Sequence, residues 1–109
     1  MATPTIVDED TFSIPDGNEN DVFSTASAGF YFLTIDENAI TGSDEIVVRL
    51  YKVVVSGGSY RLIHTQTLTG AKTGEGFYVP AISSSYGWKF SIERTSGTVA
   101  SIPYIVESV

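Results

Sequence analysis

The hydrophobic residues of this chain fall into short runs rich in β-branched and aromatic types, separated by Gly, Ser, Asp and Asn. No stretch shows the three-to-four-residue apolar spacing of an amphipathic helix, so the pattern predicts strands throughout. We expect strands near residues 23–26, 29–35, 46–55, 60–68, 77–82, 88–95 and 98–106. An eighth, short edge strand within residues 5–14 stays open.

Seven to eight short strands at regular spacing in 109 residues predict an all-β fold, a small antiparallel β-sandwich that is jelly-roll-like or Ig-like. Residues 29–35 and 46–55 are apolar on both faces over much of their length, so we expect them to be central strands or to face a second contact surface. Pro80 and Pro103 lack a backbone donor, so their strands are expected to be edges or to carry bulges.

Two hairpins can be argued from the turn residues. Ser56-Gly57-Gly58-Ser59 lies between two apolar runs, and its glycines suit a tight return. For the last two strands, a three-residue loop, 95–97, keeps the apolar faces together. It pairs Phe90 with Ile102, both buried, and places Gly97 in a left-handed position.

Charge is distributed very unevenly along the chain. The first 45 residues carry ten carboxylates and no Lys or Arg, whereas the last 64 carry all six basic residues and three carboxylates, for a net charge of −7. Such a chain can pair its own ends, or pair head to tail with another copy. The negative balance argues against binding to a nucleic-acid backbone.

The same distribution divides the chain into an acidic N-terminal arm or edge segment, residues 1–22, and a β-sandwich domain, residues 23–109. Three interpretations of residues 7–21 stay open: a solvated arm or lead-in strand, an arm ordered by a neighbour's basic surface, and contact within the subunit. The absence of cysteine excludes disulfides and thiolate metal sites. We find no signal peptide or transmembrane segment and expect a soluble protein.

Candidate chemistry is sparse. His64 is the only histidine, and no serine stands in a nucleophile-elbow motif, so a catalytic triad is not expected. Asp16, Asn18 and Asn20 begin like a calcium loop, but Asp21 and Ser27 occupy the positions that need Gly and Glu. An irregular calcium site would draw on these candidates: Asp16, Asn18, Asp21, Asp36-Glu37 and Asp44-Glu45. We predict no catalytic, cofactor-binding or metal-binding residue, no cofactor, and no enzymatic activity.

Aromatic residues provide the last candidate site. Trp88 alternates with Phe90 and Ile92, which predicts a core position, whereas Tyr86 lies beside Gly87 in a Ser-rich loop and is expected to be exposed. An exposed platform of two or more aromatic rings could stack on sugars. Its further candidates are Tyr31, Tyr51, Tyr60, Tyr78 and Tyr104.

A small, acidic, Ser/Thr-rich, all-β chain without cysteine resembles the accessory shell proteins of viruses and phages, and also small surface-layer or fibre modules. The resemblance implies a non-enzymatic structural protein of an assembly, with a virion-associated capsid decoration or minor structural protein as the leading hypothesis. The alternatives are a carbohydrate-binding module that uses exposed aromatics and a free-standing soluble binding domain. We expect protein partners, either its own copies as a homo-oligomer or a capsid or surface lattice. Nucleic-acid binding and membrane insertion are not expected, and the expected location is a virion or an extracellular surface assembly.

Overall fold

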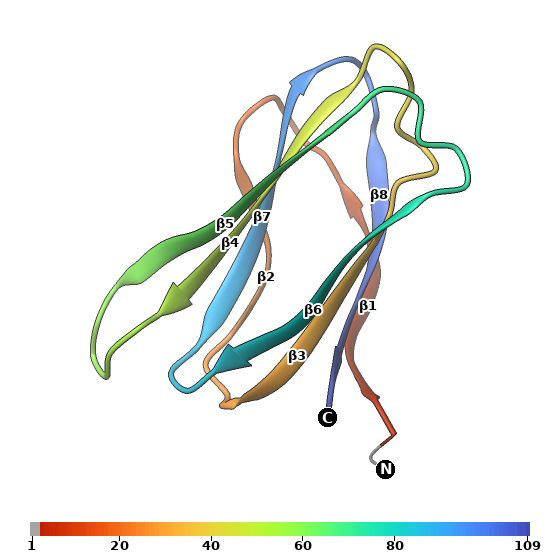
Figure 1. Cartoon of the computed structure of the whole chain (residues 1–109). Helices are drawn as coiled ribbons and strands as arrows, with labels where there is room; N and C mark the ends of the chain where they lie inside the picture. The colour runs from red at the N-terminus through yellow and green to blue at the C-terminus, as the bar shows by residue number, and fades with distance from the viewer. Residues whose placement is uncertain (1–2) are drawn as a thin grey trace.

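The computed structural model describes residues 3–109, which form eight strands and no helix. Two antiparallel four-stranded sheets pack face to face (Figure 1): sheet I, in the order β1-β8-β3-β6, and sheet II, in the order β2-β7-β4-β5. This confirms the predicted β-sandwich. The strands are β1 (Thr5–Ser13), β2 (Asn20–Thr25), β3 (Gly29–Asp36), β4 (Glu45–Val53), β5 (Tyr60–Thr69), β6 (Gly76–Ser84), β7 (Trp88–Ser96) and β8 (Ser101–Ser108).

The pairing of the strands distinguishes between the two expected sandwich types. The first strand pairs with the last, the second with the seventh, the third with the sixth and the fourth with the fifth. A single antiparallel ribbon of such pairs, wrapped into two sheets, is the jelly roll. An Ig-like fold would divide its strands into ABED and CFG sheets. The chain is therefore a jelly-roll sandwich.

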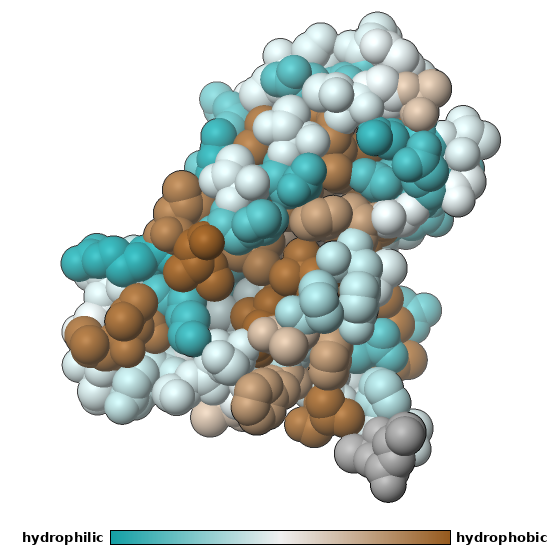
Figure 2. Space-filling model, viewed as in Figure 1, coloured by the Kyte–Doolittle hydropathy of each residue, from teal (hydrophilic) through white to brown (hydrophobic). Residues whose placement is uncertain are grey.

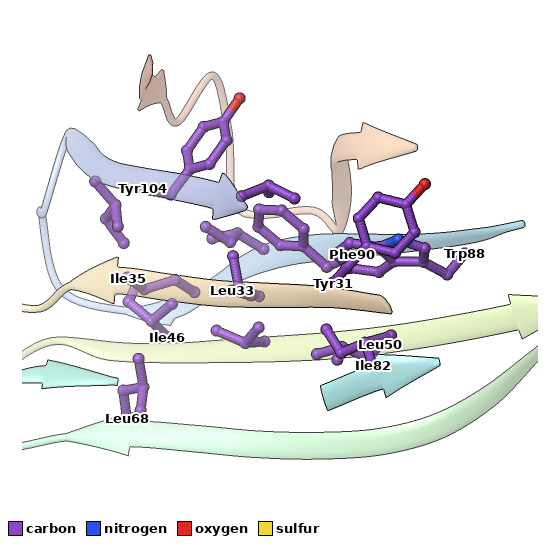
Figure 3. Packing of buried hydrophobic residues seen from close by; sticks show 14 of the residues in the cluster. Tyr31, Leu33, Ile35, Ile46, Leu50, Leu68, Ile82, Trp88, Phe90 and Tyr104 are labelled. Atoms are coloured by element: carbon purple, nitrogen blue, oxygen red, sulfur yellow. The ribbon is translucent and has the colours of Figure 1, made fainter. Parts of the chain in front are cut away.

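The core lies between the two sheets and follows the period of two (Figure 3). On β3, Tyr31, Leu33 and Ile35 are buried, while the residues between them are less so. Trp88 is fully buried, as predicted, and its ring lies 5.4 Å from that of Phe23 and 5.5 Å from that of Tyr31. The largest fully buried side chains are Trp88, Phe90, Leu33, Ile35, Ile40, Ile46, Leu50, Ile92, Ile102, Val48 and Val106.

The β4–β5 hairpin forms as the glycines predict. Val53 pairs with Tyr60, and Gly57 takes a φ of +74° in the turn between them. β3 and β4 both occupy interior positions of their sheets, which confirms that they are central strands. The ladder between β4 and β5 shifts register after Leu50 because Ile63 has no partner opposite it.

The predicted pairing of Phe90 with Ile102 is wrong. Phe90 pairs with Phe23 and Leu50 in sheet II, and Ile102 pairs with Phe12 in sheet I. Both side chains are fully buried, as expected, but they reach the core from opposite sheets. Gly97 does have a positive φ, +88°, but it starts the passage from one sheet to the other instead of closing a hairpin.

The two strand prolines behave differently. Pro80 lies in the edge strand β6, at a bulge where Ala81 takes a φ of +57°, so that prediction is confirmed. Pro103 lies in β8, an interior strand with no register shift at the proline, so the prediction of an edge or a bulge is wrong there. The ladder between β3 and β8 ends at the pair Ile35–Tyr104, and Pro103 lies just beyond that end. β3 therefore requires no backbone donor from the proline.

The acidic N-terminal segment contributes to both sheets. β1 is the edge strand left open by the sequence pattern, and it pairs along β8 from Thr5–Ser108 to Ser13–Ser101. Tyr104 reinforces this pairing by donating a hydrogen bond to Asp8 Oδ2 at 2.6 Å. Within the described residues, β1 and the start of β2 therefore pair with strands of the same subunit.

Candidate functional site

The residues that could carry catalysis do not come together. His64 lies at an exposed position on the edge strand β5, opposite Leu50. Across residues 3–109, no three or more His, Cys, Asp or Glu side chains form a group that could hold a metal ion.

The first calcium candidate is a turn. Asp16 Oδ1 accepts hydrogen bonds from the backbone N–H of Asn18 at 2.9 Å and from Asn20 Nδ2 at 3.1 Å. The Asn18 bond is the main reason that the pKa of Asp16 lies below its usual value. Asp21 instead forms a 3.0 Å ion pair with Lys89. These side chains close the β1–β2 connection and hold β2 to β7.

Asp44 is a buried carboxylate that joins two loops. Its Oδ2 accepts bonds from the backbone N–H and hydroxyl of Thr41 at 2.8 and 2.9 Å, and its Oδ1 accepts the N–H groups of Thr98 and Val99 at 2.8 and 3.2 Å. The backbone bond from Thr41, followed by the bond from Thr98, holds the pKa of Asp44 below its usual value despite burial. The carboxylate thus fixes the corner between β7 and β8 and has no free oxygen for a ligand.

The carboxylates of the two remaining candidate pairs, Asp36-Glu37 and Asp44-Glu45, also have separate surroundings. Asp36 Oδ1 accepts the N–H of Asn38 at 2.9 Å, and Glu45 Oε1 accepts the hydroxyl of Thr95 at 2.7 Å. Glu37 is buried, and burial raises its pKa. Neither pair presents two oxygens to a common ligand.

A polar network connects three strands on the outer side of sheet II. Glu19 Oε2 accepts hydrogen bonds from Ser91 Oγ at 2.5 Å and from the Tyr51 hydroxyl. Arg49 Nη1 lies 3.5 Å from Glu19 Oε1 and 2.6 Å from Glu93 Oε1. Burial alone would raise the pKa of Glu19, but the Ser91 and Tyr51 bonds and the Arg49 charge outweigh it and lower the pKa. The network binds the start of β2 to β4 and β7.

The aromatic residues do not form an open platform in sheet II. Lys89 Nζ lies over the rings of Tyr51 and Tyr60, at 5.1 and 4.9 Å from their centroids, and covers one face of each ring. Tyr31 and Tyr104 belong to the core. Tyr86 is exposed, as predicted.

The β4–β5 hairpin projects from the sandwich (Figure 1). We call its exposed apolar residues the hairpin surface: Val54, Val55, Tyr60, Leu62 and Ile63, with exposed fractions from 39% to 62%. Figure 2 shows hydrophobic residues on this projection, with hydrophilic residues between them. Arg61 is exposed among them, and Lys52 lies opposite it on β4. Residues 46–74 contain no carboxylate at all, so the hairpin is both apolar and basic.

A second surface lies on the outer side of sheet I. β1, β3, β8 and the β5–β6 loop surround an open groove of about 630 Å³. We call it the acidic groove, because its lining includes four carboxylates and no Lys, Arg or His. Those four are Glu9, Asp10, Asp36 and Glu75.

The sequence did not reveal either surface as a site. The groove exists because the register of β1 on β8 sets Glu9 opposite Ile105, and because the loop before β6 brings Glu75 to the end of β3. These pairings join residues that are far apart in the sequence. The excess of negative charge was the only indication of the groove in the sequence. The three consecutive apolar residues at positions 53–55 gave a signal that fits a buried strand as well as an exposed one.

No family model, no curated protein and no solved structure matches this chain. Nor does the described part of the chain contain a helix long and apolar enough to cross a membrane. The fold and the two surfaces therefore define the chain as a jelly-roll sandwich with an apolar, basic hairpin and an acidic groove.

Proposed function

We propose that this protein is a non-enzymatic structural component of an assembly, and specifically a virion-associated capsid decoration or minor structural protein. The observation that carries the proposal is the hairpin surface. Apolar residues scattered singly over a surface are ordinary, but a contiguous exposed group marks a contact with another molecule. Here five large apolar side chains are exposed within ten residues of one hairpin.

Protein partners are proposed because of the character of the surfaces. The partners are copies of the same chain, as a homo-oligomer, or a capsid or surface lattice. An acidic groove and a net charge of −7 are unfavourable to nucleic acid. Jelly rolls recur in viral capsid domains, which supports the virion location by analogy of fold alone.

The non-enzymatic part of the proposal is supported by how the polar side chains are used. Asp16 and Asp44 complete backbone turns, and Glu19 and Arg49 tie strands together. A catalytic carboxylate or base needs a free reactive atom facing a pocket. None of these four side chains has that arrangement.

The test is to remove the hairpin surface and measure size. Leu62→Ser combined with Ile63→Ser should convert an assembled protein into a monomer, measured by light scattering coupled to size exclusion. Circular dichroism should show an unchanged fold, because both side chains are exposed. Ile6→Ser, which changes an exposed apolar residue on β1, is the matched control and should leave assembly intact. If the double variant assembles as the natural protein does, the hairpin is not the contact.

A carbohydrate-binding module is the alternative that we propose, because Tyr78 and Tyr86 present exposed aromatic rings. Binding on a glycan array that is lost in Tyr86→Ala or Tyr78→Ala would favour it over the structural function. A free-standing binding domain is the remaining alternative. A monomer that binds no glycan would favour the free-standing binding domain.

A further inference from the structure

We infer that copies of this chain dock head to tail, with the hairpin surface of one copy seated on the acidic groove of the next. The inference rests on the proposed function, since it names the surfaces through which the assembly would form. The occupant of the groove is therefore a second copy of this chain.

Charge complementarity is the first argument. Arg61 and Lys52 face each other across the hairpin, and no carboxylate occurs from residue 46 to residue 74. The groove offers the opposite, with Glu9, Asp36 and Glu75 and no basic residue in its lining. Surfaces of opposite sign steer partners together and fix their orientation.

Apolar contact is the second argument. The groove is lined by Pro103 and Ile105 besides its carboxylates. Tyr78 is exposed on β6 directly opposite Thr34, another lining residue, and extends the apolar area to the edge of sheet I. Ile63 of an incoming hairpin, on the same face of β5 as Arg61, would thus find apolar side chains next to the acidic ones. Burial of apolar area is what supplies affinity, while the charges select the register.

The two surfaces lie on different sheets, and this determines the symmetry. The hairpin belongs to sheet II, and the groove lies on the outer side of sheet I. When each copy gives its hairpin to one neighbour and its groove to another, the contact is heterologous and generates a ring or an extended lattice. Each copy in such an arrangement uses both surfaces at once.

A charge exchange tests this geometry. Arg61→Glu would set a carboxylate against the acidic groove of the next copy, and Glu75→Lys would set an ammonium against the basic hairpin. Each variant alone should lose assembly by at least tenfold in midpoint concentration. An equimolar mixture should recover it, because every contact in an alternating array then joins opposite charges. Both side chains are exposed, so folding is preserved, and circular dichroism checks this.

Glu107→Lys is the matched control, since it reverses a charge on the same sheet outside the groove lining and should leave assembly unchanged. Recovery only in the mixture establishes the head-to-tail contact. If the natural protein assembles but both variants assemble equally well alone, the docking inference is wrong and the structural function stands. If the natural protein never assembles with itself, both self-assembly and the docking inference fall.

Discussion

At the residue scale, Asp44 is the most consequential side chain outside the apolar core. It accepts four hydrogen bonds from two loops that are more than fifty residues apart. Because its pKa is lowered in the folded state, its contribution to stability is present above its unfolded pKa, about 3.9, and is lost as pH falls through the folded value. Asp44→Asn should cost about 2 kcal/mol or more near neutral pH, since hydrogen bonds to a charged group are the strong ones.

Urea melts of the natural protein and of Asp44→Asn at neutral pH and near pH 2.5 measure this contribution. The difference between the two proteins should shrink at the acidic pH, because below about 3.9 the unfolded chain takes up a proton more readily than the folded Asp44 does. Asp36→Asn is the control, because Asp36 caps one exposed backbone N–H and should matter far less. A difference that does not depend on pH would contradict the role given to the Asp44 charge.

Gly97 is the second residue with a specific prediction. A Cβ built there would lie 1.9 Å from Asp44 Oδ1 and 2.6 Å from Asp44 Cα, and the backbone φ is +88°. Gly57 has a similar φ, +74°, with open space around it. Gly57→Ala should therefore cost only the left-handed backbone penalty of about 1–2 kcal/mol. Gly97→Ala should cost clearly more, and equal losses in thermal or urea melts would show that Asp44 does not approach so closely.

At the element scale, the N-terminal strand β1 bears on whether the sandwich folds when its acidic segment is removed. If strands began near Phe23, removal of residues 1–21 would leave a folded domain. The structure contradicts that premise, because β1 is a full edge strand and β2 starts at Asn20. The deletion would also remove Phe12, which packs on the core, and Glu19, the centre of the polar network.

We therefore predict that deletion of residues 1–21 lowers the melting temperature sharply or prevents folding, as measured by circular dichroism and calorimetry. Deletion of residues 1–4, which precede β1, is the control and should have little effect. A truncated protein that melts like the natural one would mean that β1 and the start of β2 are dispensable.

The strands show why part of this fold could be predicted from sequence. Alternation of apolar residues on β3 and β7, and the glycine turn between β4 and β5, are local signals, and the structure bears them out. The prediction that β7 and β8 form one hairpin was wrong, because the alternation of apolar residues shows only which face of each strand is buried. Phe90 and Ile102 satisfy the same pattern whether they pair in one sheet or meet across two. Asp44 binds the chain where it crosses between the sheets, and that contact spans more than fifty residues of sequence.

The candidate surfaces were less predictable than the fold. Asp16, Asp36 and Asp44 looked like possible cation ligands, yet their oxygens bind nearby backbone N–H groups. Whether a short polar side chain serves a turn or a ligand depends on loop geometry that spacing alone does not define. The groove, in turn, depends on the register of β1 on β8, which is a long-range pairing.

At the scale of the whole molecule, the uneven charge of the sequence becomes a distribution in space. The carboxylates of β1 and of the loops at the end of β3 surround the groove, whereas residues 46–74, which include the tip of the hairpin, carry only basic charges. Some of the opposite charges do pair within the subunit, as Lys89 does with Asp21 and Arg49 with Glu19. The exposed charges of the hairpin and of the groove are left to meet other molecules.

Sedimentation velocity of the natural protein over a range of concentrations, at low and high salt, tests the central claim of self-assembly most directly. At ~0.1 M salt, where screening extends over ~10 Å, we predict species well above the 11.7 kDa monomer. At ~1 M, where it shortens to ~3 Å, those species should shift to higher midpoint concentrations. A single 11.7 kDa species at every concentration and salt would contradict self-assembly through these surfaces.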